Sequence, residues 1–210
     1  LPFKTVTEIL DKAWQVPWDS VLSSLEKDCK VASLGQVHFG RLKNGRSVAI
    51  KVQFPEIAAS VETELDLFGL MPKVGPVAKW GFHLEGYRDA FWHNFTEELD
   101  YKTEYLHQQK YREMVAVLED VIVPEIFVEH CRPNVLVQSR EDGFSIDEAE
   151  KMSQSDRQAI GRVVLRHYLH MLFRHGLVHS DPNPGNFAFR RVGRDKFALV
   201  LYDYGSILEI

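Results

Sequence analysis

One short segment limits how this chain can fold more than any other. The sequence GLVHSDPNPGNFAF, residues 176–189, places Pro182 and Pro184 between two apolar runs. Because proline fixes φ and lacks an amide proton, the segment cannot be helical, and it predicts a polar loop between two strands. Asp181 and Asn186 lie on this loop, where polar side chains are often placed for chemistry, although Asp-Pro and Asn-Pro are also ordinary turn formers.

The remaining patterns predict helices and strands in a mixed order. Residues 5–27 predict two short helices split at Pro17, and apolar periodicity predicts further helices over 55–71, 86–119 and 153–176, the last closed by Gly176. Strands are predicted at 36–42 and 47–54, joined by a tight Asn44-Gly45 turn, and at 121–129, 134–141 and 196–203. This order predicts an α+β protein with a sheet-bearing front and a helical back.

The charge, the cysteine content and the apolar runs of the sequence limit which partners and which cellular compartment the protein is expected to have. The formal net charge is -5 and there is no long Lys/Arg run, so we expect no nucleic-acid partner. Cys29 and Cys131 are too few for a disulfide framework and predict reduced, semi-buried thiols in a reducing compartment. No run approaches the roughly 20 apolar residues of a membrane helix, and no targeting peptide is recognisable. The chain starts at Leu1, which predicts an excised segment.

Three stretches carry residues suited to phosphate chemistry. Lys51 ends the strand sequence Val48-Ala49-Ile50-Lys51 and could neutralise an anion. Asp181 could accept a hydroxyl proton, and Asn186 could offer an amide oxygen to Mg²⁺. Asp203 begins the sequence Asp203-Tyr204-Gly205 at a strand end, where its carboxylate could bind Mg²⁺. Each stretch alone has an ordinary structural explanation, but in this order they match the protein-kinase motif set.

A kinase lysine also requires an acidic partner on a helix. Two predicted helices offer candidates, which are Glu62, Glu64, Asp66, Glu97, Glu98, Asp100 and Glu104.

The same residues resemble the UbiB/AarF family of atypical, protein-kinase-like proteins. VASLGQVHFGRLKNGRSVAIKVQFP resembles the family's Ala-rich loop and lysine strand, and EELDYKTE its acidic helix. VHSDPNPGNF resembles its H-x-D-P-x-P-G-N catalytic loop, and LYDYG its D-F-G. The sequence departs from the family at Lys30 and Val31, where alanines are usual, at Asn183 and at Tyr204, and it lacks the family's K-x-G-Q signature.

The resemblance implies a bilobal kinase-like fold. Residues 1–140 would form the N-terminal helices and the N-lobe, and residues 141–210 the start of a helical C-lobe, with the domain truncated at both ends. The resemblance also implies a role for each site residue. Asp181 would be the catalytic-loop Asp; Lys51 would contact phosphates and pair with Glu98, supported by Glu104; Ala32, Ser33, Gly35 and Gln36 would line the nucleotide loop; Asn186 and Asp203 would bind Mg²⁺.

The implied activity is that of an atypical kinase or ATPase that binds ATP or ADP with Mg²⁺. It would support synthesis of ubiquinone or a related isoprenoid lipid at a membrane surface, in a bacterial inner membrane, mitochondrion or plastid. Quinone-precursor lipids and lipid-synthesis proteins are the implied partners. Three alternatives stay open: a small-molecule phosphotransferase of the aminoglycoside or choline kinase type, a nucleotide-binding pseudokinase scaffold, and a hydrolytic metal site at His179 and Asp181.

Overall fold

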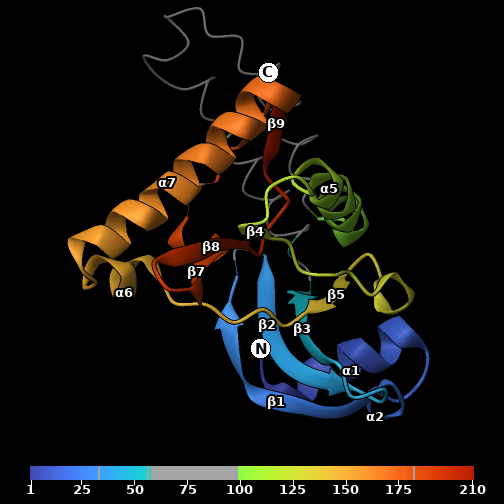
Figure 1. The fold of residues 1–210 in the computed structure, drawn as a ribbon. Helices are drawn as coiled ribbons and strands as arrows, with labels where there is room; N and C mark the ends of the chain where they lie inside the picture. Colours follow the sequence, from blue (N-terminus) through green and yellow to red (C-terminus); the bar gives the residue numbers. More distant parts are fainter. Residues whose placement is uncertain (33, 56, 58–98, 182) are drawn as a thin grey trace, which may run out of the picture.

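A computed structural model of the chain describes residues 1–32, 34–55, 57, 99–181 and 183–210. Figure 1 shows the N-terminal strands and α1 at one end of the molecule, α7 toward the other, and β7 and β8 between them. The helices are α1 (Phe3–Trp14), α2 (Trp18–Val21), α5 (Tyr101–Met114), α6 (Ile146–Glu150) and α7 (Gln154–His170), with shorter helical turns η3 (Val128–His130), η4 (Met171–His175) and η5 (Pro184–Asn186).

The strands form one larger sheet and two small ones. They are β1 (Leu22–Val31), β2 (Gly35–Leu42), β3 (Ser47–Gln53), β4 (Val121–Ile122), β5 (Val135–Ser139), β6 (Leu177–His179), β7 (Phe187–Gly193), β8 (Lys196–Leu201) and β9 (Ile207–Glu209). The larger sheet is antiparallel in the order β1-β2-β3-β5, and the small ones have the orders β4-β8-β7 and β6-β9. The predicted hairpin of β2 and β3 and the predicted strand β5 are confirmed, and Lys51 on β3 pairs with Val37 and Leu136.

The predicted second helix in residues 5–27 is wrong. Only Trp18–Val21 is helical, and Leu22–Val31 forms β1, which pairs with β2. The sequence of this segment predicts a helix because its serines, lysines and acidic residues are poor strand formers. As an edge strand it leaves most side chains exposed, so pairing with β2 decides the conformation rather than local preference.

Of the helix predicted over 86–119, the described part is helical only from Tyr101 to Met114. Asp100 has an extended backbone and its side chain accepts a hydrogen bond from the Lys102 amide, so α5 begins at Tyr101. It ends at Met114, earlier than expected. Residues 56 and 58–98 lie outside the described part of the chain. The strand predicted at 121–129 is limited to β4, because Pro124 has no amide to continue a ladder.

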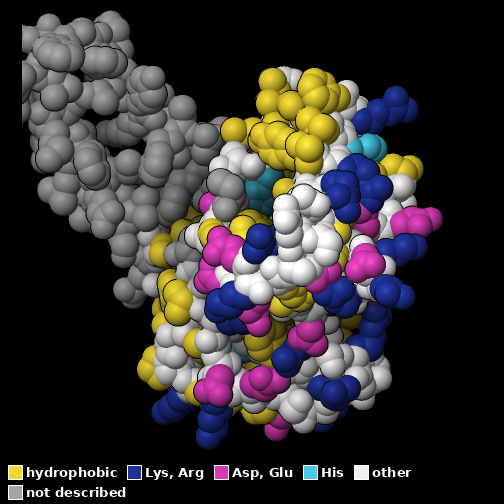
Figure 2. Space-filling view, turned by 60° about the vertical axis from the view of Figure 1, so that its left-hand side comes forward, with side chains coloured by type: hydrophobic (Ala, Val, Ile, Leu, Met, Phe, Trp, Pro, Cys, Tyr) yellow, Lys and Arg dark blue, Asp and Glu magenta, His cyan; other side chains and the backbone are white. Residues whose placement is uncertain are grey.

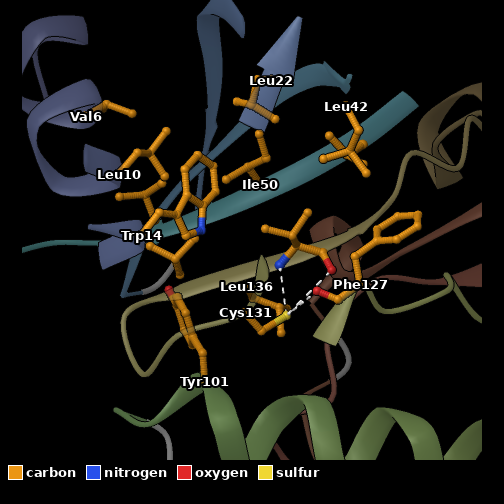
Figure 3. Close-up of a cluster of buried hydrophobic side chains, with 14 residues drawn as sticks. Val6, Leu10, Trp14, Leu22, Leu42, Ile50, Tyr101, Phe127, Cys131 and Leu136 are labelled. Carbon is orange, nitrogen blue, oxygen red and sulfur yellow. Dashed lines mark hydrogen bonds between the residues drawn. The ribbon is translucent and has the colours of Figure 1, made fainter. Parts of the chain in front are cut away.

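The first hydrophobic core lies between the larger sheet, α1 and the start of α5. Figure 3 shows its side chains converging from these elements. Its buried members are Val6, Leu10, Trp14, Leu22, Leu42, Val48, Ile50, Val52, Tyr101, Phe127, Cys131, Val135, Leu136 and Val137. The Cys131 thiol donates to the Phe127 carbonyl and accepts from the Val137 amide, and burial raises its pKa to about 11. Cys131 is therefore a neutral buried thiol, whereas Cys29 is an exposed one, not semi-buried as predicted.

The second hydrophobic core joins the rest of α5 to α7 and the β4-β8-β7 sheet. Its buried members are Tyr111, Val115, Val123, Ala149, Ala159, Ile160, Val163, Met171, Leu177, Phe189, Phe197, Leu199, Leu201 and Tyr204. The helix predicted over 153–176 is confirmed, since α7 continues into the π-helical turn η4 and ends at Gly176. Gly176 has φ 64, a left-handed conformation that glycine adopts without steric cost. Helix α5 thus contributes to both cores.

The surface differs in character over the molecule. Figure 2 shows hydrophobic side chains gathered toward one end, while Lys, Arg, Asp and Glu are mixed over the remainder of that face. Large exposed hydrophobic side chains lie along α7, η4 and β9, namely Val164, Leu165, Tyr168, Leu169, Phe173, Leu208 and Ile210. No described helix is long and apolar enough to cross a bilayer.

A buried histidine in the second core makes stability depend on pH. The Tyr111 hydroxyl and Nε2 of His167 share a hydrogen bond of 2.6 Å, and burial, then nearby His179 and His170, lower the pKa of His167 to about 4. The unfolded chain protonates this histidine near pH 6.5, so its contribution is full above that pH and is lost as the pH falls toward 4. We expect a loss of roughly 3 kcal/mol from this group over that interval.

Urea unfolding of the wild type and of His167→Gln across this interval measures the effect. The variant should be less stable near neutral pH but should lose less stability on acidification. His130→Gln, which replaces a more exposed histidine, should keep the wild-type slope. Parallel pH profiles for wild type and His167→Gln would contradict the assignment.

Candidate active site

An ammonium group lies between two carboxylates where the two cores meet. Lys51 Nζ is 2.9 and 2.8 Å from the two carboxylate oxygens of Glu104 and 2.9 Å from Oδ2 of Asp203. The side chains of Lys51, Glu104 and Asp203 are 11%, 4% and 21% exposed. Lys51 lies 53 positions from Glu104 and 152 positions from Asp203 along the chain, yet the three side chains form one largely buried charge cluster.

Local structure explains why these three side chains meet. Lys51 leaves the central strand β3, and Glu104 lies in the first turn of α5, whose start is fixed by the Asp100 cap. Asp203 lies two residues after β8 and accepts a hydrogen bond from the Gly205 amide at 2.9 Å, which holds its carboxylate toward Lys51. The Tyr101 ring lies 5.0 Å from Lys51 Nζ, so an aromatic face also stabilises the cation.

The charges of the cluster depend on one another. Burial disfavours the Lys51 ammonium, but Glu104 and Asp203 outweigh it and hold its pKa above the usual range. Burial also disfavours the Asp203 carboxylate, yet Lys51 and the Gly205 amide lower its pKa below the ordinary value. For Glu104 burial dominates and raises the pKa, and Lys51 only partly opposes the shift. Lys51 is thus the charge that keeps both carboxylates compatible with burial.

The Pro-containing loop presents its polar groups at the surface between β6 and β7. Asn186 Nδ2 donates to Oδ2 of Asp181 at 2.7 Å, which leaves the amide oxygen of Asn186 as the atom able to ligate a cation. Asp181 is exposed, and Asn186 is half-buried. His179 Nε2 donates to the Asp203 carbonyl oxygen at 3.0 Å, and Nδ1 accepts from the Asp181 amide, so this histidine ties the loop to the Asp203 segment.

The turn before β2 and the first residues of β2 approach the same end of the sheet. A Cβ at Gly35 would clash with the Val52 carbonyl oxygen and crowd the Tyr101 hydroxyl, so glycine is required for this close approach. The Ala32 amide donates to the Gly35 carbonyl at 2.9 Å, which closes a tight turn. Gln36 is buried and its Nε2 donates to Cys29 Sγ at 3.1 Å. Ser33 of this segment lies outside the described residues.

The structure brings Lys51, Glu104 and Asp203 together, and Asp181 together with Asn186. The predicted lysine partner Glu98 lies outside the described residues, while Glu104 itself makes the ion pair. Sequence reasoning missed Tyr101 beneath the lysine and two buried glutamines, Gln108 and Gln138, behind the cluster. Tyr101 lies within the acidic helix motif EELDYKTE, so its proximity to the lysine could have been predicted from the sequence. No motif around Gln108 or Gln138 predicts that they pair.

A separate cavity of about 440 Å³ lies between α1 and the end of β3. Ile9, Phe54 and Pro133 line it together with Arg132, and none of the predicted site residues does. The guanidinium of Arg132 donates to the backbone carbonyls of Ala13, Glu129 and Cys131. Because this cation already has backbone partners, we assign no ligand to the cavity.

The fold places the chain among protein-kinase-like proteins. The structure of an Rv3197–erythromycin complex from Mycobacterium tuberculosis superposes with a TM-score of 0.82 at 26% identity, covering 100% of this chain and 52% of that one. A Rio2 kinase–ADP/Mg²⁺-phosphoaspartate complex from Chaetomium thermophilum has a TM-score of 0.50 at 12% identity, covering 90% and 49%. At that identity the second likeness concerns the fold alone. The predicted bilobal kinase-like α+β fold is confirmed.

The family follows from sequence comparison. A model of the ABC1 atypical kinase-like domain matches residues 1–210, and the chain belongs to this family, as the UbiB/AarF resemblance predicted. The Caenorhabditis elegans atypical kinase coq-8, mitochondrial, is 30% identical over 210 residues (98% of this chain, 28% of the relative). Rattus norvegicus atypical kinase COQ8B, mitochondrial, is 30% identical over 203 residues (97% and 37%). Arabidopsis thaliana protein ACTIVITY OF BC1 COMPLEX KINASE 8, chloroplastic, is 31% identical over 190 residues (85% and 24%). The chain spans well under half of each relative's length.

Removing the ammonium tests the electrostatic role of Lys51. Lys51→Met should lower the free energy of unfolding by about 3–5 kcal/mol near neutral pH, because two buried carboxylates lose their counter-charge. Without Lys51 the folded-state pKa of Glu104 lies further above the unfolded value of about 4.3, so the deficit grows as the pH rises past that value and shrinks in acid. Urea unfolding at several pH values measures both effects.

Lys110→Met is the matched control, because Lys110 lies exposed on α5. It should change stability little at any pH. A Lys51→Met protein as stable as wild type at neutral pH would show that the cluster does not carry the charges described.

Proposed function

We propose that this chain is an atypical kinase or ATPase that binds an adenine nucleotide with Mg²⁺. The observation that carries the proposal is the Lys51–Asp203 contact of 2.9 Å, made between residues 152 positions apart and reinforced by Glu104. A cation and a carboxylate held at one point are the two elements that nucleotide phosphates and their metal require.

The residues available fit a magnesium–nucleotide group. Asp203 offers carboxylate oxygens and Asn186 an amide oxygen, both hard donors of the kind Mg²⁺ prefers. Mg²⁺ commonly keeps several waters and is bound by one or two carboxylates together with substrate phosphates, so few protein ligands suffice. When bound, the ion would neutralise charge on the phosphates. Lys51 would contact the same phosphates, and Ala32, Ser33, Gly35 and Gln36 would line the loop over the nucleotide.

Asp181 is the residue we assign next to the phosphate acceptor. Its carboxylate is exposed, and two hydrogen bonds orient it: Oδ1 accepts from the Asn183 amide and Oδ2 accepts from Asn186 Nδ2. A carboxylate in this setting can accept the proton of an incoming hydroxyl group or water. We assign Glu104 as the partner that orients Lys51, and Glu98 as a second acidic residue of the same motif. The division into a lobe up to about residue 140 and a second lobe from 141 remains part of this proposal.

The contacts of His179 argue against the alternative hydrolytic metal site. Both of its ring nitrogens are engaged, one with the Asp203 carbonyl and the other with the Asp181 amide. Within the described residues, no group of three or more His, Cys, Asp or Glu side chains gathers as a metal site would require. The Lys51–Glu104–Asp203 cluster therefore supports phosphate chemistry better than hydrolysis at a histidine-bound metal.

We further propose a role in the synthesis of ubiquinone or a related isoprenoid lipid, at a membrane surface in a mitochondrion or plastid. The support comes from the relatives, which are named mitochondrial or chloroplastic atypical kinases. Quinone-precursor lipids and lipid-synthesis proteins would be the partners. ATP hydrolysis measured with and without liposomes and phenolic quinone-like lipids tests this role, and an unchanged rate under all conditions would count against it.

Two variants separate binding from turnover. Asp203→Ala should abolish Mg²⁺-dependent nucleotide binding and lower ATP turnover by about a hundredfold or more, since it removes a metal-binding carboxylate. Asp181→Asn should lower turnover far more than ADP affinity, because its amide oxygen can still accept the hydrogen bond from Asn186 but the side chain can no longer accept a proton. Calorimetry with Mg²⁺–ADP and a phosphate-release assay measure the two properties.

Asp147→Ala, at an exposed position on α6, is the control and should behave as wild type. Nucleotide binding without turnover in the wild type would favour the pseudokinase scaffold. Absence of Mg²⁺-dependent binding would refute the proposal as a whole.

A further inference from the structure

Two buried glutamines connect the elements that carry Glu104 and Asp203. Gln108 on α5 is 1% exposed and Gln138 on β5 is 7% exposed. Gln108 Nε2 donates to Oε1 of Gln138 at 2.8 Å and to the Pro124 carbonyl at 3.0 Å, while Gln138 Nε2 donates to the Tyr202 carbonyl at 3.3 Å. The result is a continuous amide bridge from α5 through β5 to the end of β8.

Both ends of the amide bridge adjoin the charge cluster. Gln108 follows Glu104 by four positions, so the two side chains lie on one face of α5. Tyr202 immediately precedes Asp203. On β5, Gln138 pairs with Ala49 of β3, and Leu136 pairs with Lys51. Because side chains two residues apart in a strand point to the same face, Gln138 lies on the same face of the sheet as Lys51. The bridge therefore joins α5, which carries Glu104, to the segment that carries Asp203, through β5, the strand that pairs with the strand of Lys51.

The hydrogen bonds allow only one arrangement of the two amides. If the Gln108 amide were turned over, its oxygen would face two acceptors, the Pro124 carbonyl and Gln138 Oε1. If Gln138 were turned over, its oxygen would face the Tyr202 carbonyl. Buried polar pairs stabilise little compared with well-packed apolar side chains, and Gln108 Oε1 has no hydrogen-bond partner among the described residues. Stability alone does not explain the pair, whereas a requirement for a fixed relative position does.

We propose that Gln108 and Gln138 are positioning residues that set the distance of Glu104 and Asp203 from Lys51. The proposal deepens the phosphate-handling role assigned above and rests on it for its catalytic meaning. Neither glutamine hydrogen-bonds to Lys51, Glu104 or Asp203, so each acts through the element that carries an acidic residue.

The test uses Gln108→Met and Gln138→Met, which keep the side-chain length and remove the amide hydrogen bonds. In the nucleotide-free protein, Lys51 should be acylated by an amine-reactive reagent roughly fivefold faster in either variant, the factor corresponding to loss of one ordinary hydrogen bond. The reason is that loosened carboxylates leave the ammonium accessible. Peptide mass spectrometry reports the Lys51 labelling rate, and in phosphate-release assays kcat should fall more than KM rises.

Two controls separate positioning from general stability. Gln109→Met changes the same residue type at an exposed neighbouring position on α5 and should leave the Lys51 labelling rate unchanged. Leu10→Ala creates a cavity in the first core and should lower stability without changing the labelling rate. If Gln138→Met does not fold, Gln138→Asn replaces it, since the amide shortened by one methylene cannot reach both Gln108 and Tyr202.

The outcomes distinguish this inference from the proposed function. Faster Lys51 labelling in both glutamine variants, with wild-type rates in both controls, supports positioning. Wild-type labelling rates in folded glutamine variants, or equally fast labelling in Leu10→Ala, would overturn it. A wild-type protein that does not bind Mg²⁺–ADP would refute the proposed function, while the labelling comparison, which needs no nucleotide, would still decide whether the amide bridge positions the cluster.

Discussion

The buried ammonium of Lys51 is the interaction on which the other contacts of the candidate site depend. Two carboxylates in a dry environment repel one another and lose hydration, and only a shared counter-charge makes their burial tolerable. The hydrogen bonds of Lys51 to Glu104 and Asp203 provide it. The Tyr101 ring, the Asp100 cap and the Gly205 amide each fix one member of the cluster in place. The cluster is therefore a charge-balanced unit and not three independent side chains.

The position of this unit follows from the way α5 belongs to both hydrophobic cores. Tyr101 at its start is buried in the first core, and Tyr111, three turns along, is buried in the second. Tyr111 also contacts Tyr204, the neighbour of Asp203, edge to face at 5.3 Å. A displacement of α5 would thus disturb apolar packing at both ends, which makes the placement of Glu104 a property of the whole packing arrangement.

The sequence alone predicted the elements whose signals are local. The Asn44-Gly45 hairpin, the strand that precedes Asp203 and the helix closed by Gly176 follow from turn residues and apolar periodicity. Prediction failed where partners distant in the sequence decide the conformation. Residues 22–31 have polar, helix-compatible side chains but pair with β2, and the start of α5 depends on one capping carboxylate. The three charged residues were identified in advance, yet their mutual distances and the Gln108–Gln138 pair exist only in the folded chain.

The wide spacing of the charge cluster along the chain also matters while the protein is being made. Lys51 and Glu104 belong to segments that leave the ribosome well before Asp203 does. A nascent chain can assemble the larger sheet and begin α5, but the last carboxylate arrives only with the strand that completes the second core. Until then a partly assembled domain lacks one carboxylate of the charge cluster. The order of synthesis thereby delays completion of the charge cluster until the polypeptide through Asp203 has left the exit tunnel.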